Sequence, residues 1–142
     1  MRLVMDTAAM VAAIRSDQGA SRQLLVAALH RRLVLLVSTP LLLEYEAVMT
    51  RTEHLTASGL SSDDVGRLLD AVAAGATPVR LAFLWRPTLR DADDDMVLET
   101  AMNGRADVIA TFNVRDFQLG TDRFGIDVAK PGEVLRRLET RP

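Results

Sequence analysis

The chain contains no cysteine. This absence excludes disulfide bonds, thiolate catalysis and zinc sites with cysteine ligands, and it agrees with a reducing compartment. Long apolar runs are also lacking, because the longest ones, residues 33–37 and 41–43, are far too short to span a bilayer. Charged residues interrupt the N-terminal segment before any apolar region long enough for a secretory signal. We therefore expect a cytoplasmic protein with no membrane segment.

A strong excess of one charge is absent as well, because the formal net charge is only -2. A strongly basic nucleic-acid-binding protein is not indicated, although a local basic patch can coexist with an acidic pocket. Lysine is nearly missing: Lys130 is the only one, and every other basic residue is arginine. Arginine suits phosphate recognition, but a coding bias toward arginine explains the same pattern more simply.

What the chain does contain is typical of one globular domain. Its 142 residues are 49% hydrophobic and 25% charged. A chain of this length and composition can bury a stable core without disulfide bonds. No repeat, linker or low-complexity tract interrupts the sequence. We therefore expect a single domain over residues 1–142.

Short apolar runs alternate with helical patterns along the chain. Buried strands are predicted at residues 3–5, 33–37, 108–111 and 126–129, and an edge strand is predicted at 79–85. Helices are predicted at residues 8–14, 21–29, 40–50, 61–75, from 91 to about 102, and from 131 onward, with a polar connection around 52–62. This alternation predicts an α/β fold with three α/β/α layers around a mainly parallel sheet.

Acidic residues occur where the predicted strands end. Asp6 closes the first strand, Asp116 follows the strand at 108–111, and Glu44 and the acidic run 91–95 lie on helices that begin near the same edge. Because the carboxyl ends of parallel strands form one rim, these acids are expected to converge. Carboxylate oxygens are the ligands that Mg²⁺ and Mn²⁺ prefer, and a cation makes their crowding tolerable. Simpler explanations are a helix cap at Asp6 and a dipole-favoured helix start at 91–95.

Four segments carry a resemblance to a known family. Residues 4–7 (VMDT), 42–45 (LLEY), 90–101 (RDADDDMVLETA) and 106–117 (ADVIATFNVRDF) resemble the motifs of PIN-domain ribonucleases. The resemblance spans nearly the whole chain and is nearest to the VapC-like toxins of bacterial toxin–antitoxin pairs. It implies a PIN-like fold and a metal-dependent endoribonuclease that hydrolyses RNA phosphodiesters.

The resemblance also implies roles for individual residues. Asp6, Glu44 and Asp94 match the three principal acids, with Asp95 as the neighbour that competes with Asp94 for that assignment. Many relatives carry Asp at the position of Asn113, so the chain departs from the family pattern there.

In the expected site, Asp6 and Asp94 are direct ligands of Mg²⁺ or Mn²⁺, and Glu44 is a ligand or a base. Asn113 and Asp116 orient water, and Asp116 is a further ligand. RNA as substrate, an antitoxin that inserts a basic side chain into the pocket, and a homodimer are the implied partners.

Two other functions remain open from the sequence. An aspartyl phosphotransferase would use Asp6 as a covalent nucleophile, but such folds usually carry a second Asp two residues on, where this chain has Ala8, and they use a lysine. A non-catalytic PIN-like binding module is the other alternative, and Asn113 is the residue that favours it. The isolated histidines His30 and His54 form no metal or nucleophile pattern, and both are expected at the surface.

Overall fold

The computed structural model describes residues 1–82 and 92–140 and contains a five-stranded sheet in which every strand pair is parallel. The strand order is β3-β2-β1-β4-β5. The strands are β1 (Arg2–Met5), β2 (Val34–Val37), β3 (Thr77–Pro78), β4 (Val108–Ala110) and β5 (Asp127–Ala129). The first connections run outward to β3, and the chain then returns past β1 to add β4 and β5, so the sheet is wound in both directions.

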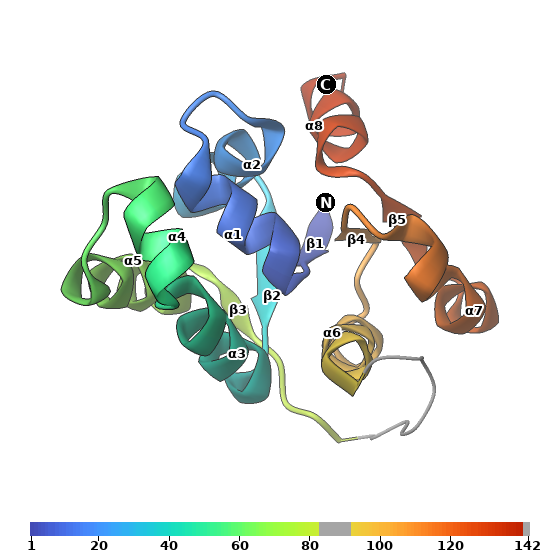
Figure 1. Ribbon diagram of the computed structural model, residues 1–142. Coiled ribbons are helices and arrows are strands. Elements are labelled where there is room, and N and C mark those ends of the chain that lie inside the picture. Colours follow the sequence, from blue (N-terminus) through green and yellow to red (C-terminus); the bar gives the residue numbers. More distant parts are fainter. Residues whose placement is uncertain (83–91, 141–142) are drawn as a thin grey trace.

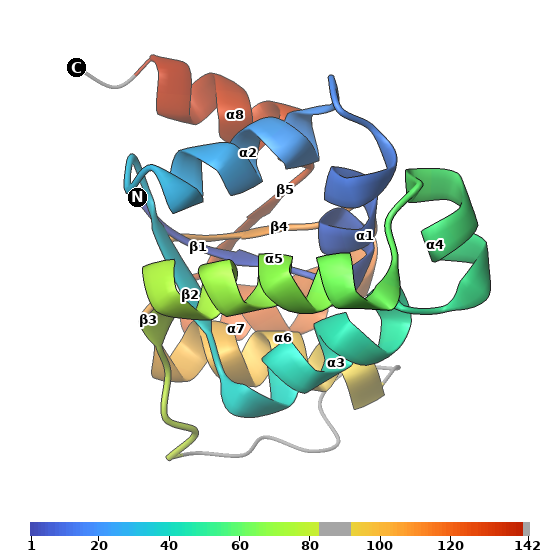
Figure 2. The same ribbon diagram turned by 90° about the vertical axis from the view of Figure 1, so that its left-hand side faces the viewer.

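Helices cover both faces of this sheet (Figures 1 and 2). One face carries α1 (Thr7–Arg15), α2 (Ala20–Leu29), α5 (Ser62–Gly75) and α8 (Pro131–Glu139), and the other carries α6 (Ala92–Asn103) and α7 (Val114–Phe124). Helix α3 (Thr39–Met49) follows β2 directly and packs against both α1 and α6, and α4 (Thr52–Ser58) packs against α1. The predicted three-layer α/β/α architecture with a parallel sheet is confirmed.

Among the described residues, no helix combines the length and the apolar character needed to cross a membrane.

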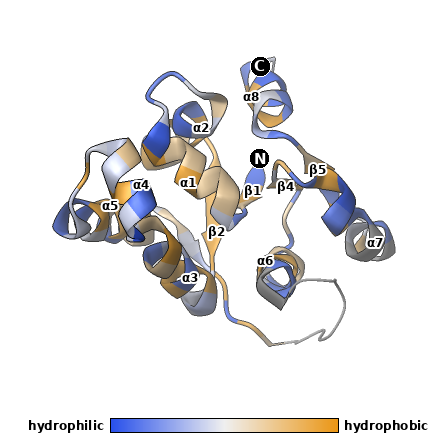
Figure 3. Ribbon diagram, in the orientation of Figure 1, coloured by the Kyte–Doolittle hydropathy of each residue, from blue (hydrophilic) through white to orange (hydrophobic). Residues whose placement is uncertain are grey.

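The central strands form because their side chains are apolar in an unbroken run. In β1, β2 and β4 almost every residue is buried, including Leu3, Leu36 and Ile109 with no exposed surface. A parallel strand between two helical layers is buried on both faces, so continuous apolar sequence replaces the alternation of a half-exposed strand. Figure 3 shows the hydrophobic residues concentrated along β2 and α1.

Serine hydroxyl groups cap the starts of two helices. Ser38 accepts a hydrogen bond from the Leu41 amide at 3.3 Å, and Pro40 occupies the first turn of α3. At the start of α5 a reciprocal capping box forms, in which the Ser61 hydroxyl accepts from the Asp64 amide at 3.1 Å and the Asp64 carboxylate accepts from the Ser61 amide at 2.9 Å. These side chains satisfy amides that the helices themselves leave unpaired.

The structure differs from the sequence prediction in three connections. The edge strand lies at Thr77–Pro78 rather than at 79–85; residues 79–82 are not strand, and the remainder of that prediction, with Trp85, lies outside the described residues. The polar stretch near 52–62 contains α4, which has no buried residue and therefore no apolar stripe to reveal it. Helix α7 (Val114–Phe124) was not predicted either.

The register of the sheet places two strand ends side by side. Met5 of β1 pairs with Ala110 of β4, and the Asp6 amide donates to the Ala110 carbonyl at 3.1 Å. Asp6 and Thr111, which are 105 positions apart in sequence, are therefore neighbours at the carboxyl edge of the sheet. The carboxyl ends of β1 and β4 therefore lie side by side at one rim of the sheet.

Gly104, just after α6, generates a stability prediction. A Cβ atom there would lie 2.8 Å from Val79 Cγ2 and 3.0 Å from Leu36 Cδ1, so Gly104→Ala overpacks this junction and is expected to destabilise the protein by about 1–3 kcal/mol. Gly66 is the matched control because a Cβ there meets nothing within 4 Å, and Gly66→Ala within α5 is expected to stabilise by about 0.5–1 kcal/mol. Urea unfolding monitored by circular dichroism measures both, and equal effects of the two substitutions would contradict the packing argument.

Candidate active site

Asp6 lies at the junction of β1 and α1, where one carboxylate serves two elements. Its Oδ1 accepts a hydrogen bond from the Ala9 amide at 2.8 Å, which caps α1. Its Oδ2 accepts from the buried hydroxyl of Thr111, and the same hydroxyl accepts from the Asn113 amide at 3.0 Å. Thr111 thus links Asp6 to the segment that carries Asn113.

Burial changes the acidity of Asp6, because only 4% of this residue is exposed. Desolvation raises the pKa of Asp6 above its usual range, and the hydrogen bonds from Thr111 and Ala9 oppose that rise. The charged form of Asp6 is therefore costly in the bare protein. A positive charge placed beside it would remove that cost.

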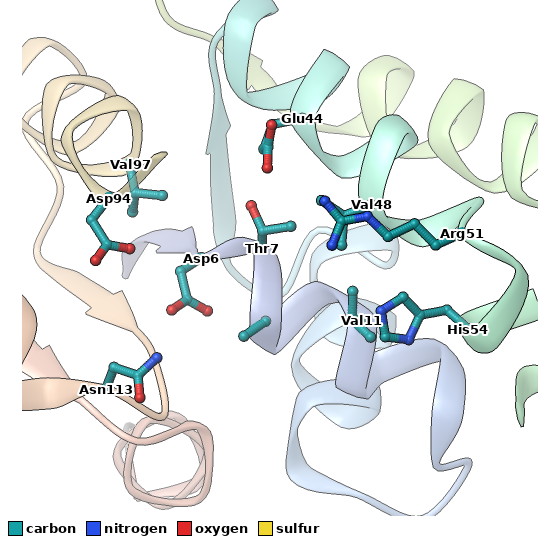
Figure 4. Close-up of a pocket in the computed structure, with 11 residues that line it drawn as sticks. Asp6, Thr7, Val11, Glu44, Val48, Arg51, His54, Asp94, Val97 and Asn113 are labelled. Atoms are coloured by element: carbon teal, nitrogen blue, oxygen red, sulfur yellow. The ribbon is translucent and has the colours of Figure 1, made fainter. Parts of the chain in front are cut away.

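A pocket of about 310 Å³ opens beside Asp6 at the carboxyl edge of the sheet. Four of the five predicted site residues, Asp6, Glu44, Asp94 and Asn113, line it together. Figure 4 shows Asp94 and Asn113 directed toward Asp6, and Glu44 directed into the pocket from α3. The fold thus brings together side chains from the ends of β1 and β4 and from helices α3 and α6. The pocket is also lined by Thr7, Ala8, Val11, Val48, Arg51, His54 and Val97.

Glu44 is positioned by its neighbour Tyr45. The Tyr45 ring is fully buried, and its hydroxyl donates to the Met5 carbonyl at the end of β1. Desolvation, together with the charge of Asp6, raises the pKa of Tyr45, so its hydroxyl stays protonated and remains a donor. This contact fixes α3, the helix that carries Glu44, against the end of β1.

The structure separates residues that the sequence leaves as alternatives. Asp94 lines the pocket, whereas Asp95 is 2% exposed and is not among the lining residues. Asn113 lies at the pocket, while Asp116, in the first turn of α7, is exposed and does not line it. A role for Asp116 as a metal ligand remains a prediction.

Two basic residues of the pocket escaped the sequence reasoning. Arg51 lies between α3 and α4, and His54 lies on α4, where its side chain is only 14% exposed. The expectation that His54 is a surface residue is therefore wrong. Both residues reach the pocket because α4 packs against α1, and no local sequence pattern predicts that contact. Thr111 was missed as a partner of Asp6, although its position at the end of a buried strand was a usable signal.

The donor chemistry of the pocket fits a hard divalent cation, because carboxylates of Asp6, Glu44 and Asp94 and the amide oxygen of Asn113 line one space. Within residues 1–82 and 92–140, however, no group of three or more His, Cys, Asp or Glu side chains is close enough to hold a metal ion. The carboxylates face a common pocket without sharing one coordination sphere. A cation held by all three requires rearrangement of at least one side chain.

The fold and this pocket define an α/β protein whose polar side chains gather at the carboxyl edge of a parallel sheet. A family model described as PIN domain matches residues 2–115, which is more than half of the chain. The chain therefore belongs to the PIN-domain family, whose members are generally nucleases. The match includes the pocket residues from Asp6 to Asn113 and ends just before Asp116. A search of curated proteins found no match.

The raised pKa of Asp6 leads to a prediction about stability. Since the folded chain binds the Asp6 proton more tightly than the unfolded chain, this group stabilises the fold fully below pH 3.8 and loses that effect as pH rises through the folded pKa. Asp6→Asn keeps a side-chain oxygen for the Ala9 amide without the charge. In EDTA near pH 7 it is expected to raise the Tm by roughly 2–4 °C for each kcal/mol of desolvation cost removed.

Thermal unfolding of both proteins across a pH series measures this effect. The Tm difference between Asp6→Asn and the unchanged chain should grow from acidic to neutral pH. A difference that does not vary with pH would contradict the assignment of a raised pKa to Asp6.

Proposed function

We propose that the chain is a divalent-metal-dependent endoribonuclease. The observation that carries the proposal is the pocket in which Asp6, Glu44 and Asp94, from three separate elements, face a common space in a PIN-domain fold. Membership of the family supports hydrolysis of nucleic acid, and the acid pocket supports dependence on a cation. The preference for RNA rests on the resemblance of the motifs to PIN-domain ribonucleases.

Asp6, Glu44 and Asp94 would hold Mg²⁺ or Mn²⁺. Such an ion supplies charge neutralisation at the phosphodiester and a lowered pKa for a water molecule. Thr111 keeps the Asp6 carboxylate oriented, and Tyr45 fixes the helix that carries Glu44 against the end of β1. Asn113 offers an amide that donates to or accepts from water or substrate without adding negative charge. The apolar side chains of Val11, Val48 and Val97 line the same pocket and reduce its hydration.

Asp94→Asn tests the assignment of the acids. Loss of one carboxylate from the pocket is expected to reduce cleavage of single-stranded RNA in Mg²⁺ or Mn²⁺ by about 100-fold or more, since Asp94 would help to hold the cation that neutralises charge in the transition state. Asp17→Asn is the matched control because Asp17 is exposed, lies between α1 and α2, and loses the same charge. Gel analysis of an end-labelled RNA measures both.

Two further samples complete that experiment. EDTA is expected to stop cleavage by the unchanged chain, and Asp116→Asn is expected to reduce it less than Asp94→Asn, since Asp116 is exposed and outside the pocket. Full activity of Asp94→Asn, or activity that persists in EDTA, would reject the metal-dependent mechanism. Binding of RNA without cleavage by the unchanged chain would favour the non-catalytic PIN-like module, for which Asn113 is the motivating residue.

We further propose that the chain is the toxin of a toxin–antitoxin pair, acts in the cytoplasm and forms a homodimer. The support is the resemblance of its motifs to VapC-like toxins, together with an acid pocket that offers a binding place for a basic side chain of an antitoxin.

Expression in a bacterial host tests the toxin role. Induction of the unchanged chain is expected to arrest growth because uncontrolled RNA cleavage stops translation, and Asp94→Asn is expected to relieve the arrest. Growth curves at matched protein levels, checked by immunoblot, provide the measurement. Normal growth of cells that produce a chain able to cut RNA in vitro would reject the toxin role and leave the ribonuclease proposal standing.

A further inference from the structure

The pocket has two chemically different ends. Asp6 and Asp94 lie at one end, and Arg51 and His54 lie at the other, with Val11 beside the histidine ring (Figure 4). An acidic end alone repels a polyanion such as RNA. A basic end in the same pocket changes this balance, because it offers a place where a phosphate is attracted rather than repelled.

Arg51 is fixed through its backbone while its side chain remains available. The Arg51 amide donates to the Val48 carbonyl at 3.1 Å, and the Arg51 carbonyl accepts from the His54 and Leu55 amides, both at 3.0 Å. Arg51 occupies the N-cap position of α4 without a side-chain capping bond. Among the described residues, the guanidinium forms no salt bridge with a carboxylate within 4.0 Å. Within the described part of the chain the cation therefore has no salt-bridge partner, and Glu44 is the carboxylate that shares its side of the pocket.

His54 lies one turn from Arg51 and has an unusual ring environment. Its Nδ1 is buried and has no hydrogen-bond partner among the residues that the structure describes, while its Nε2 lies 3.8 Å from Glu53 Oε1. Buried polar nitrogens in folded proteins are nearly always paired, so an unpaired one calls for a partner that binds from outside. His54 lines the pocket, and a small rotation of its ring would bring this nitrogen to a ligand there.

We propose that Arg51 and His54 form a phosphate-binding subsite, which holds the RNA backbone beside the phosphodiester to be cut. This inference rests on the proposed ribonuclease function. The guanidinium of Arg51 presents a fork of donors that matches phosphate oxygens, and His54 adds one N–H donor.

The consequence for the substrate is a length requirement. A strand must carry a second phosphate next to the reacting one in order to reach both ends of the pocket. The shortest good ligand therefore carries two phosphates, and a mononucleotide is a poor ligand.

Binding of a short fluorescein-labelled single-stranded RNA, followed by fluorescence anisotropy in the Asp6→Asn background with Mg²⁺, tests the subsite separately from cleavage. Arg51→Ala is expected to weaken binding by about tenfold. It is also expected to reduce the dependence of log K on log salt concentration by about 0.7, the value for one phosphate contact on a single strand. Arg51→Lys should retain the salt dependence, since it keeps the charge while losing the fork.

The histidine has its own pair of variants. His54→Ala is expected to weaken binding, and His54→Asn to restore part of it, because the asparagine amide nitrogen is as many bonds from Cα as Nδ1 is. Arg15→Ala is the control, because Arg15 is exposed at the far end of α1 from Asp6 and should leave affinity and salt dependence unchanged. Circular dichroism melts verify that each variant is folded.

The outcomes of this experiment separate the two proposals. Arg51→Ala binding with the affinity and salt dependence of Arg15→Ala overturns the subsite, as does an absence of RNA binding in the Asp6→Asn background. Binding that depends on Arg51, in a chain that never cuts RNA in Mg²⁺ or Mn²⁺, rejects the ribonuclease while the subsite stands. Cleavage that stops with Asp94→Asn but is unchanged by Arg51→Ala supports the ribonuclease and rejects the subsite.

Discussion

The hydrogen bonds around Asp6 hold the rest of the site in place. One carboxylate oxygen caps α1 through the Ala9 amide, and the other accepts from Thr111 at the end of the neighbouring strand. Parallel pairing of β1 with β4 is what brings these donors to the same carboxylate. The cost of burying the charge is offset only in part, which raises the pKa of Asp6.

Opposite charges organise the pocket around that centre. Glu44 and Asp94 join Asp6 from helices on either side, and Asn113 contributes an amide where a further carboxylate would add repulsion. Arg51 and His54 give the far end the opposite character. A pocket of this kind suits a negatively charged ligand that binds beside a cation. A phosphodiester in a metal-dependent nuclease is such a ligand.

The sequence predicts the central strands because burial on both faces requires continuous apolar residues, as in β1 and β4. It predicts the convergence of Asp6 and the residues after β4 because parallel strands share one rim. It does not reveal α4, which buries no residue, or the two-residue strand β3, whose residues are exposed. Arg51 and His54 also escape prediction, because the packing of α4 against α1 is a tertiary contact with no local signature.

Asp6 has two roles, and together they limit which substitutions the fold tolerates at this position. A substitution that removes the acid also removes the acceptor that begins α1, so most replacements at this position would damage folding together with chemistry. Asparagine, serine and threonine keep an acceptor oxygen there. A homologue that lost catalysis would therefore be selected to retain a small polar residue at position 6. The sequence around its first strand would then differ little from that of an active protein.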